Sequence, residues 1–362
     1  MDALIPSAVI GCGRMGAFTS PGVRAHAPAC WFPLAHAEAI DAHPGLRLDA
    51  VCDVDGEAAG RAAAAWGGCR AYTDSDALLR EVQPQLLAIA TRTMGRAALI
   101  ESAVAGGVRA LHVEKPLCNG MAELEGLRRL FARDDVFVSY GAVRRWFTVY
   151  RHARALADSG RWGALREIRV ALGAGTLFWT HPHSWDLLLF CAGARAVASV
   201  QGRLADLRFV DRQSRRVESD PRVVAALVHF DDGVCGVVTQ AQGADLVLSC
   251  ERGEITVRAD GAALELYATP EGKAYPERQL LAQPEADGAA GGTLAPVSQL
   301  VQCLLGDADA QGANRRLKDG ILRGQDIAFA LLQSHAEGSR CVAPGEVDPD
   351  WFVEALSGGR HA

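Results

Sequence analysis

The chain reads SAVIGCGRMG over residues 7–16, a short apolar run followed at once by the pattern Gly-x-Gly-x-x-Gly. In a dinucleotide-binding turn the first glycine permits a tight turn and the second lets the backbone approach a pyrophosphate. The third lets a helix pack closely on the strand. Gly11, Gly13 and Gly16 hold these three places. The stretch therefore predicts a nucleotide-binding turn after a first strand at residues 7–10.

The acidic residue that usually accompanies such a turn comes late in this sequence. It is expected about 20 residues beyond the glycines, whereas the next strand, residues 46–53, ends in Asp53 at roughly twice that distance. Removing about residues 17–34 restores the ordinary spacing, so we interpret that segment as an insertion. Asp53 would bind the adenosine ribose hydroxyls and repel a 2′-phosphate, which favours NAD without excluding NADP. Alternatively, Asp53 caps the helix expected at 56–66.

Short apolar strands alternate with helical segments through the first third of the chain. This alternation predicts an α/β fold with a parallel, doubly wound sheet. We place this Rossmann domain at residues 1–138. Its expected strands are 7–10, 46–53, 86–91, 110–113 and 136–140, and its expected helices are 34–42, 56–66, 75–82 (capped at Ser75-Asp76), 97–105 and 121–132.

The pattern changes in the rest of the chain, which we assign to a second domain at residues 139–362. After a helix at 147–158, runs of β character follow with few helices between them. Hairpin signals such as Asp260-Gly261 separate the runs. These features predict an α+β domain with an open, largely antiparallel sheet, a surface loop at 270–296, and helices at 296–305 and 317–337. The expected strands are 168–172, 197–201, 223–230, 234–240, 246–249, 255–258 and 263–268.

Composition narrows the class of protein. The net charge of −6 gives no electrostatic reason to bind nucleic acid or an anionic membrane. No apolar run approaches the roughly 20 residues that span a bilayer, and the N-terminus lacks a signal-peptide pattern. The 10 cysteines are scattered without a Cys-x-x-Cys pair, which predicts free thiols in a reducing cytoplasm.

A second motif follows the strand at 110–113, where the chain reads Glu114-Lys115-Pro116. A lysine at the carboxyl end of a parallel strand points into the ligand crevice of such a sheet. Desolvation there would lower its pKa and make it a usable acid or base. The alternative is a surface lysine in a turn.

With these motifs in place, the chain resembles the Gfo/Idh/MocA oxidoreductases, the family of glucose-fructose oxidoreductase and inositol dehydrogenase. The resemblance implies an N-terminal Rossmann domain that holds NAD or NADP. It also implies a C-terminal domain whose sheet carries the substrate site on one face and often oligomerises, here as a homodimer or homotetramer. The motifs that carry it, in order over nearly the whole chain, are GCGRMG, AYTDSDALL, LLAIAT, AVAGGVRALHVEKPL, SGRWGALREIRV, HSWDLLL and DGILRGQDIAFALLQSHAEGSRCV.

The resemblance also implies roles for single residues. Lys115 is similar to the family's lysine that binds or protonates the reacting oxygen, and His183 is similar to its catalytic histidine. An imidazole with a pKa of about 6.5 suits proton exchange with an alcohol as hydride moves. The residues implied in binding the cofactor are Gly11, Gly13, Arg14, Met15, Gly16, Asp53, Thr91, Arg92, Glu114 and Lys115.

The sequence departs from the family pattern in three places. Trp179 stands where many members have an aspartate, His181 where many have a glycine, and Thr91-Arg92-Thr93 where many have Thr-Pro. Loss of the aspartate removes an orienting partner for the histidine or for a substrate hydroxyl, a role that His181 or Asp186 could take over. We therefore expect a substrate other than the simplest family sugars.

The expected substrate site draws on several further residues. Arg144 and Arg145 either reach a phosphate or carboxylate of the substrate or cap the domain junction. The insertion either covers the active site as a lid or is a structural element packed on the neighbouring domain or subunit. His181 and His183 have no third ligand near them in sequence, so we expect no metal. The predicted substrate-binding residues are Arg24, Trp31, Arg144, Arg145, Trp179, His181 and Asp186.

Together these features predict an NAD(P)-dependent oxidoreductase. It would interconvert a secondary hydroxyl and a ketone on a sugar, sugar nucleotide or cyclitol, with Lys115 and His183 handling the proton. Two alternatives stay open: an imine or enone reductase on the same fold, and a dinucleotide-binding regulator without turnover.

Overall fold

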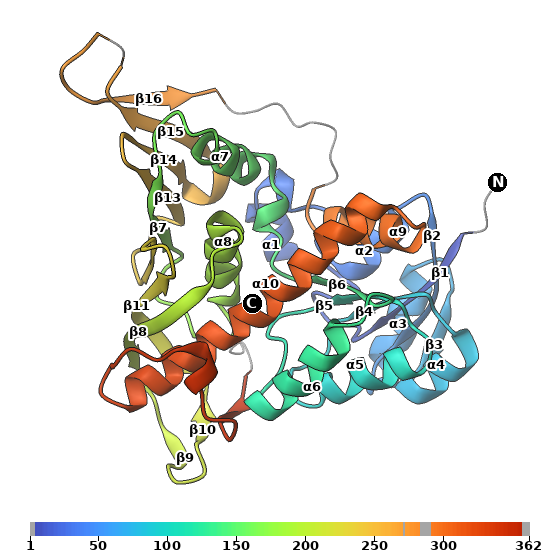
Figure 1. Ribbon diagram of the computed structural model, residues 1–362. Helices are drawn as coiled ribbons and strands as arrows, with labels where there is room; N and C mark the ends of the chain where they lie inside the picture. Colours follow the sequence, from blue (N-terminus) through green and yellow to red (C-terminus); the bar gives the residue numbers. More distant parts are fainter. Residues whose placement is uncertain (1–3, 271, 283–290, 357–362) are drawn as a thin grey trace. The chain divides into compact units, whose positions relative to one another are not determined.

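The computed structural model describes residues 4–270, 272–282 and 291–356, which form two compact units (Figure 1). Of these described residues, the first unit combines 4–143 with 291–322 and residue 356. The second combines residues 144–270, 272–282 and 323–355. Each unit has its own sheet.

The sheet of the first unit has six parallel strands in the order β3-β2-β1-β4-β5-β6. The predicted doubly wound parallel sheet is thus confirmed. The order reverses between β1 and β4, and ligands of such sheets bind beyond the carboxyl ends of the strands at this point. The strands are β1 (Ile5–Ile10), β2 (Leu46–Cys52), β3 (Arg70–Tyr72), β4 (Leu86–Ile89), β5 (Ala110–Val113) and β6 (Phe137–Tyr140).

Most helices of this unit lie where the sequence places them. One expected cap differs: Asp74, not Ser75, caps the fourth helix, because its side chain accepts a hydrogen bond from the N–H of Asp76. The helices are α1 (Pro21–His26), α2 (His36–Asp41), α3 (Gly56–Ala65), α4 (Ser75–Val82), α5 (Arg96–Ala105) and α6 (Met121–Phe131), with a 3-10 turn η1 at Ala29–Trp31.

Two late segments return to the first sheet. Helix α9 (Leu294–Leu304) packs on β5, β6 and α2. Helix α10 (Ala308–Ala336) places Asn314 against the edge strand β6, where its amide accepts from the Val138 N–H at 3.1 Å and donates to the Val138 carbonyl at 2.9 Å. The helical pattern at 296–305 was readable from the sequence, but the sheet on which it packs was not.

The second unit contains an eight-stranded sheet in the order β16-β15-β14-β13-β7-β12-β11-β8. Among its described pairs only β7 with β12 is parallel, so the predicted largely antiparallel sheet is confirmed. The strands are β7 (Leu165–Ala171), β8 (Val197–Ala205), β11 (Arg222–Phe230), β12 (Cys235–Thr239), β13 (Asp245–Cys250), β14 (Gly253–Arg258), β15 (Ala263–Ala268) and β16 (Glu277–Leu281).

Strand β16 corrects the expectation of a continuous surface loop at residues 270–296. It pairs with β15 as an exposed edge strand, and its apolar content is too low to signal a strand. Residue 271 and residues 283–290 of that expected loop lie outside the described residues.

Helices α7 (Thr148–Asp158) and α8 (Pro182–Ala192) pack against the second sheet. The contact with α8 is close, because a Cβ on Gly236 of β12 would lie 2.5 Å from a Leu188 methyl. A small sheet, β17-β10-β9, joins Phe352–Ala355, Arg216–Ser219 and Phe209–Asp211. Three 3-10 turns are η2 (Arg144–Trp146), η3 (Ala259–Gly261) and η4 (Pro344–Glu346). Across the described residues, no helix has both the length and the apolar character needed to cross a membrane.

Candidate functional site

The glycine turn after β1 is built so that two of its glycines cannot carry a side chain. Gly11 has a φ of 98°, and a Cβ there would lie 2.6 Å from the Ala90 carbonyl carbon. A Cβ on Gly16 would lie 1.6 Å from the Gly11 oxygen. Gly13 differs, because a Cβ there would meet no atom within 4 Å. The chain's own packing does not demand glycine at residue 13, whereas close approach of a pyrophosphate would.

Asp53, just after β2, is joined to this turn. Its carboxylate accepts from the N–H of Cys12 at 2.8 Å and from the N–H of Asp55 at 3.0 Å. Helix α3 is capped instead by Asp55, which accepts from Glu57 N at 2.9 Å. The alternative reading of Asp53 as the cap of α3 is therefore wrong. Its partly exposed carboxylate beside the turn fits an adenosine ribose.

The end of β4 adds a further polar group to this edge of the sheet. The Thr91 hydroxyl is buried, and the described residues provide it with no hydrogen-bond partner. A buried polar atom of this kind usually indicates a water or ligand. Arg92 and Arg14 are exposed, and Met15 is partly buried. The residues present at the carboxyl ends of β1, β2 and β4 thus fit a dinucleotide.

The insertion interrupts a helix without changing its register. The first helical turn forms when Ala17 N donates to the Gly13 oxygen at 2.9 Å. The next two bonds come from beyond the insertion, from His36 N to Met15 O and from Ala37 N to Gly16 O, both at 2.8 Å. His36 and Ala37 thus occupy the positions four residues after Met15 and Gly16 in an uninterrupted helix.

Glu38 fastens the two ends of the insertion together. Its carboxylate accepts from the Thr19 hydroxyl at 2.9 Å and from the N–H groups of Leu34 at 3.3 Å and Ala35 at 3.4 Å. It also forms an ion pair with Arg24. Five protons directed at one half-buried carboxylate, including that of the Thr19 N–H at 3.3 Å, make it the anchor of the segment.

Both insertion residues predicted to touch substrate contribute to the packing of the first unit. The Arg24 guanidinium, besides pairing with Glu38, lies 5.6 Å from the centre of the Phe32 ring. The backbone at Trp31 lies against Gly292, where a Cβ would be 2.1 Å from the Trp31 oxygen. Gly292 N also donates to Cys30 O at 2.9 Å. The insertion is therefore packed on its own unit, and a role for it toward substrate stays a prediction.

The turn that carries Lys115 is held by a buried arginine that sequence reasoning missed. Arg96, only 2% exposed, donates to the carbonyls of Thr91, Glu114 and Pro116. It therefore joins the ends of β4 and β5. Arg96 opens an alanine-rich helix, and no feature of the neighbouring sequence signals that it is buried.

Glu114 lies beneath the Lys115 backbone. Its carboxylate is 3.2 Å from His36 Nε2 and accepts from Lys115 N at 3.2 Å. Burial favours the protonated acid, but the His36 hydrogen bond and the charges of Lys115 and Arg96 outweigh it, so the pKa of Glu114 is lowered. Lys115 itself is partly exposed, next to an anion and at the same sheet edge as the glycine turn.

In the second unit, the predicted residues gather at the start of α8. His181 is its N-cap and is fully buried, with Nδ1 2.9 Å from the Ser184 hydroxyl. Burial lowers the pKa of His181 to about 4, so its imidazole is neutral near pH 7. His183 lies in the first turn of the helix and is partly exposed. The N–H of Trp179 donates to Asp220 at 2.8 Å, a partner that sequence reasoning missed.

The two predicted arginines of this unit bind carboxylates of the same unit. Arg145 forms a bidentate pair with Asp186, at 2.7 and 2.9 Å. Arg144 forms another with Asp260, at 2.6 and 2.7 Å, and the Tyr150 hydroxyl donates to the same carboxylate at 2.9 Å. Asp186 therefore serves as the counter-ion of Arg145.

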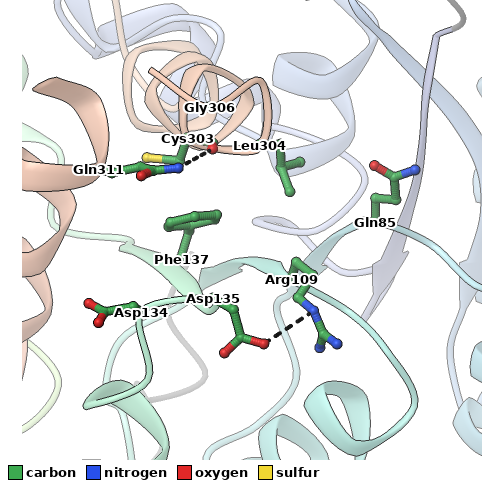
Figure 2. Close-up of a pocket in the computed structure, with 9 residues that line it drawn as sticks. All are labelled: Gln85, Arg109, Asp134, Asp135, Phe137, Cys303, Leu304, Gly306 and Gln311. Carbon is green, nitrogen blue, oxygen red and sulfur yellow. Dashed lines mark hydrogen bonds and ion pairs between the residues drawn. The ribbon is translucent and has the colours of Figure 1, made fainter. Parts of the chain in front are cut away.

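The first unit has a hollow at the amino ends of β4, β5 and β6, opposite the glycine turn (Figure 2). Its volume is about 540 Å³. Figure 2 shows Phe137 facing into it from β6, with the Arg109–Asp135 ion pair of 3.5 Å on one side. Gln311 on the other side donates to the Cys303 oxygen at 3.0 Å. None of the predicted site residues lines this hollow.

Comparison with known proteins also identifies a dinucleotide-binding fold in the first unit. Residues 5–142 match the model of the GFO_IDH_MocA family, an oxidoreductase family with an NAD-binding Rossmann fold. The family and the NAD cofactor expected from the motifs are confirmed for this part of the chain. No curated protein matches the chain by sequence.

Solved structures share the fold over nearly the whole chain. An inositol dehydrogenase homolog from Azotobacter vinelandii, complexed with NADH and myo-inositol, is 16% identical with a TM-score of 0.72, covering 94% of this chain and 98% of that one. The WlbA dehydrogenase from Bordetella pertussis, in complex with NADH and UDP-GlcNAcA, is 17% identical with a TM-score of 0.68 over 94% and 98%. An NAD-binding oxidoreductase from Klebsiella pneumoniae is 20% identical with a TM-score of 0.73 over 94% and 99%.

Proposed function

We propose that the chain is an NAD-dependent oxidoreductase that interconverts a secondary hydroxyl and a ketone on a sugar, sugar nucleotide or cyclitol. The observation that carries the proposal is Lys115 at the carboxyl end of β5, on a turn that Arg96 and Glu114 hold in place. A fixed ammonium group at the ligand edge of the sheet can stabilise the charge that develops on an alkoxide oxygen.

The cofactor would be held by residues at the carboxyl ends of β1, β2 and β4, where the strand order reverses. The open backbone at Gly13 would face the pyrophosphate, Asp53 would accept from the ribose hydroxyls, and the Thr91 hydroxyl would gain a partner. When bound, the nicotinamide supplies the hydride acceptor or donor. An anionic Asp53 at the ribose favours NAD over NADP.

Two side chains would handle the proton. Lys115 would bind the reacting oxygen through its ammonium group. His183, in the first turn of α8, would take the hydroxyl proton during oxidation and return it during reduction. His181 is unsuited to that exchange near pH 7, because burial lowers its pKa to about 4.

The pairing of the arginines favours an uncharged polyol over a nucleotide-linked sugar. Capturing a diphosphate with Arg144 or Arg145 would require breaking a bidentate ion pair with Asp260 or Asp186. Structures similar to this chain were solved with myo-inositol and with UDP-GlcNAcA, so the fold is compatible with both classes.

We also propose that the protein is a cytoplasmic homodimer or homotetramer. All 10 cysteines are free thiols, as suits a reducing compartment. The second sheet leaves Leu227 at 37% and Tyr267 at 43% exposed, apolar side chains that a partner subunit could cover. Light scattering of the purified chain measures the assembly, and a monomer at micromolar concentration would contradict this part.

The test is turnover followed at the nicotinamide absorbance band, with NAD and NADP and a panel of free polyols and nucleotide-linked sugars. Lys115→Met should lower kcat about 10³-fold and leave NAD affinity nearly unchanged. Lys273→Met is the matched control, because Lys273 is exposed and its ion pair with Glu277 lies at the surface. Full activity in Lys115→Met would refute the mechanism, and NAD binding without turnover of any substrate would favour the regulator.

A further inference from the structure

A buried pair of histidines lies beneath the Lys115 turn, and the proposed chemistry uses neither. His36 in α2 and His112 in β5 are fully buried, with ring centres 4.5 Å apart in an edge-to-face arrangement. His36 Nε2 contacts Glu114 at 3.2 Å, and His112 Nδ1 contacts the Ser139 hydroxyl at 2.8 Å. A fully buried polar cluster is costly to form, so its position beneath a functional turn calls for an explanation.

His36 is the residue at which the interrupted helix resumes, and it contacts two turns at once. Its backbone N–H donates to Met15 O in the glycine turn at 2.8 Å. Its side chain contacts Glu114 at the end of β5. Strand β4 lies between β1 and β5 in the sheet, so one residue bridges the dinucleotide turn and the Lys115 turn across a strand.

The carboxylate of Glu114 is confined. One oxygen contacts His36 and the other accepts from Lys115 N. A Cβ on Gly141 would lie 2.7 Å from this carboxylate, so the space on that side is already filled. The charged or titratable groups around the pair are Arg96 and Lys115, which face Glu114, and His112, which faces His36.

We propose that His36 is a positioning residue for Lys115. By donating its Nε2 hydrogen, it holds Glu114 as the anion that fixes the Lys115 backbone and favours the charged ammonium. This inference rests on the proposed role of Lys115. Without the donor, Glu114 would bind a proton more readily, and Lys115 would lose both its neighbouring charge and a fixed backbone contact.

The chain offers a direct measurement, because its only lysines are Lys115, Lys273 and Lys318. Competitive acylation with acetic anhydride, read by peptide mass spectrometry across pH, gives the pKa of each amine without any substrate. His36→Leu should lower the pKa of Lys115 by roughly one unit. The exposed Lys273 is the internal reference and should not move. His36→Gln keeps an amide donor and should retain most of the wild-type value.

Steady-state kinetics provide a second test of the role of His36. With a substrate found by the panel, His36→Leu should lower kcat on the order of tenfold while the Kd for NAD changes less than about twofold. His36→Gln should restore most of the lost kcat. A residue that served stability alone would lower the melting temperature without moving the Lys115 titration.

A second variant keeps the test decisive if His36→Leu fails to fold. Glu114→Gln removes the anion itself and should shift the Lys115 titration in the same direction. Identical Lys115 titrations in wild type and in the folded variants would overturn the inference. If Lys115→Met abolishes turnover while His36→Leu changes neither titration nor kcat, only the inference fails. If Lys115→Met retains turnover, the proposed function fails, whatever the titration shows.

Discussion

The two ends of the first sheet both carry charged side chains that form hydrogen bonds, yet these side chains differ in burial. At the carboxyl ends, Glu114 is 5% and Arg96 2% exposed, and both are joined to backbone. At the amino ends, the side chains of Arg133 and Asp135 are 44% and 53% exposed, and they form an ion pair of 2.8 Å. The degree of burial therefore distinguishes the charged groups at the two ends.

The difference shows where charge is costly in this fold. A buried ion must be paired and hydrogen-bonded, because the interior does not replace the lost water. An exposed pair stays hydrated and contributes little. The network at the carboxyl ends thus carries a desolvation cost at the edge where the glycine turn and Lys115 lie, whereas the amino-end hollow is surrounded by ordinary surface pairs.

The largest expected effect is on stability, when one arginine is removed from the carboxyl ends and, in a separate variant, one from the amino ends. Arg96→Met should lower the free energy of unfolding by about 3–5 kcal/mol, because three carbonyls and the Glu114 charge lose their partner. Arg109→Met at the amino end should cost less than about 1 kcal/mol. Urea denaturation measures both. Equal losses would break the comparison between the two ends.

A second pair of variants separates packing from ligand binding within the glycine turn. Gly16→Ala should destabilise the protein by about 1–3 kcal/mol, because its Cβ meets the backbone of Gly11. Gly13→Ala should leave stability within about 0.5 kcal/mol of wild type, while weakening NAD binding about tenfold. Thermal unfolding and NAD titration report the two effects. NAD affinity unchanged in Gly13→Ala would remove the pyrophosphate from this position.

The smallest effect concerns pH. The folded-state pKa of Glu114 lies below its ordinary value of 4.5, since His36, Lys115 and Arg96 outweigh burial. Its contribution to stability is therefore present above pH 4.5 and is lost as pH falls through the lower folded pKa. As the pH falls below 4.5, Glu114→Gln should therefore lose less stability than wild type. Denaturation curves recorded at a series of pH values measure this difference.

Asp135 is the control for that series. Its pKa is lowered too, first by the hydrogen bond from Arg133, but its side chain is exposed. Asp135→Asn should follow the wild-type curve closely. A larger pH effect at Asp135 than at Glu114 would reverse the contrast between the two ends.

Much of this fold could be predicted from local pattern. The apolar runs of β4 and β5, the glycines and the Glu114-Lys115-Pro116 turn each carry their signal within a few residues. The spacing to Asp53 also placed the insertion, because the ordinary distance is short and well defined.

The rest depends on contacts between residues distant in sequence. The bond from His36 to Glu114 joins residues 78 apart, and no feature of LAHAEAI indicates that partner. The sequence of α9 shows an apolar face but not which sheet that face packs on. Only the folded structure shows that it packs on β5 and β6. Arginines 144 and 145 could be read as ligands of an anion, and only the folded chain shows the carboxylates that they bind.

The uninterrupted register of the helix around the insertion makes residues 20–33 an exchangeable cassette. Hydrogen bonds from His36 and Ala37 close the helix over the gap, and Glu38 closes the base. Loop length then costs little, since closure entropy rises only slowly with the number of residues. Segments of other lengths could be grafted between Thr19 and Leu34, as recognition loops are grafted on an antibody framework, while the strands and α2 keep their register.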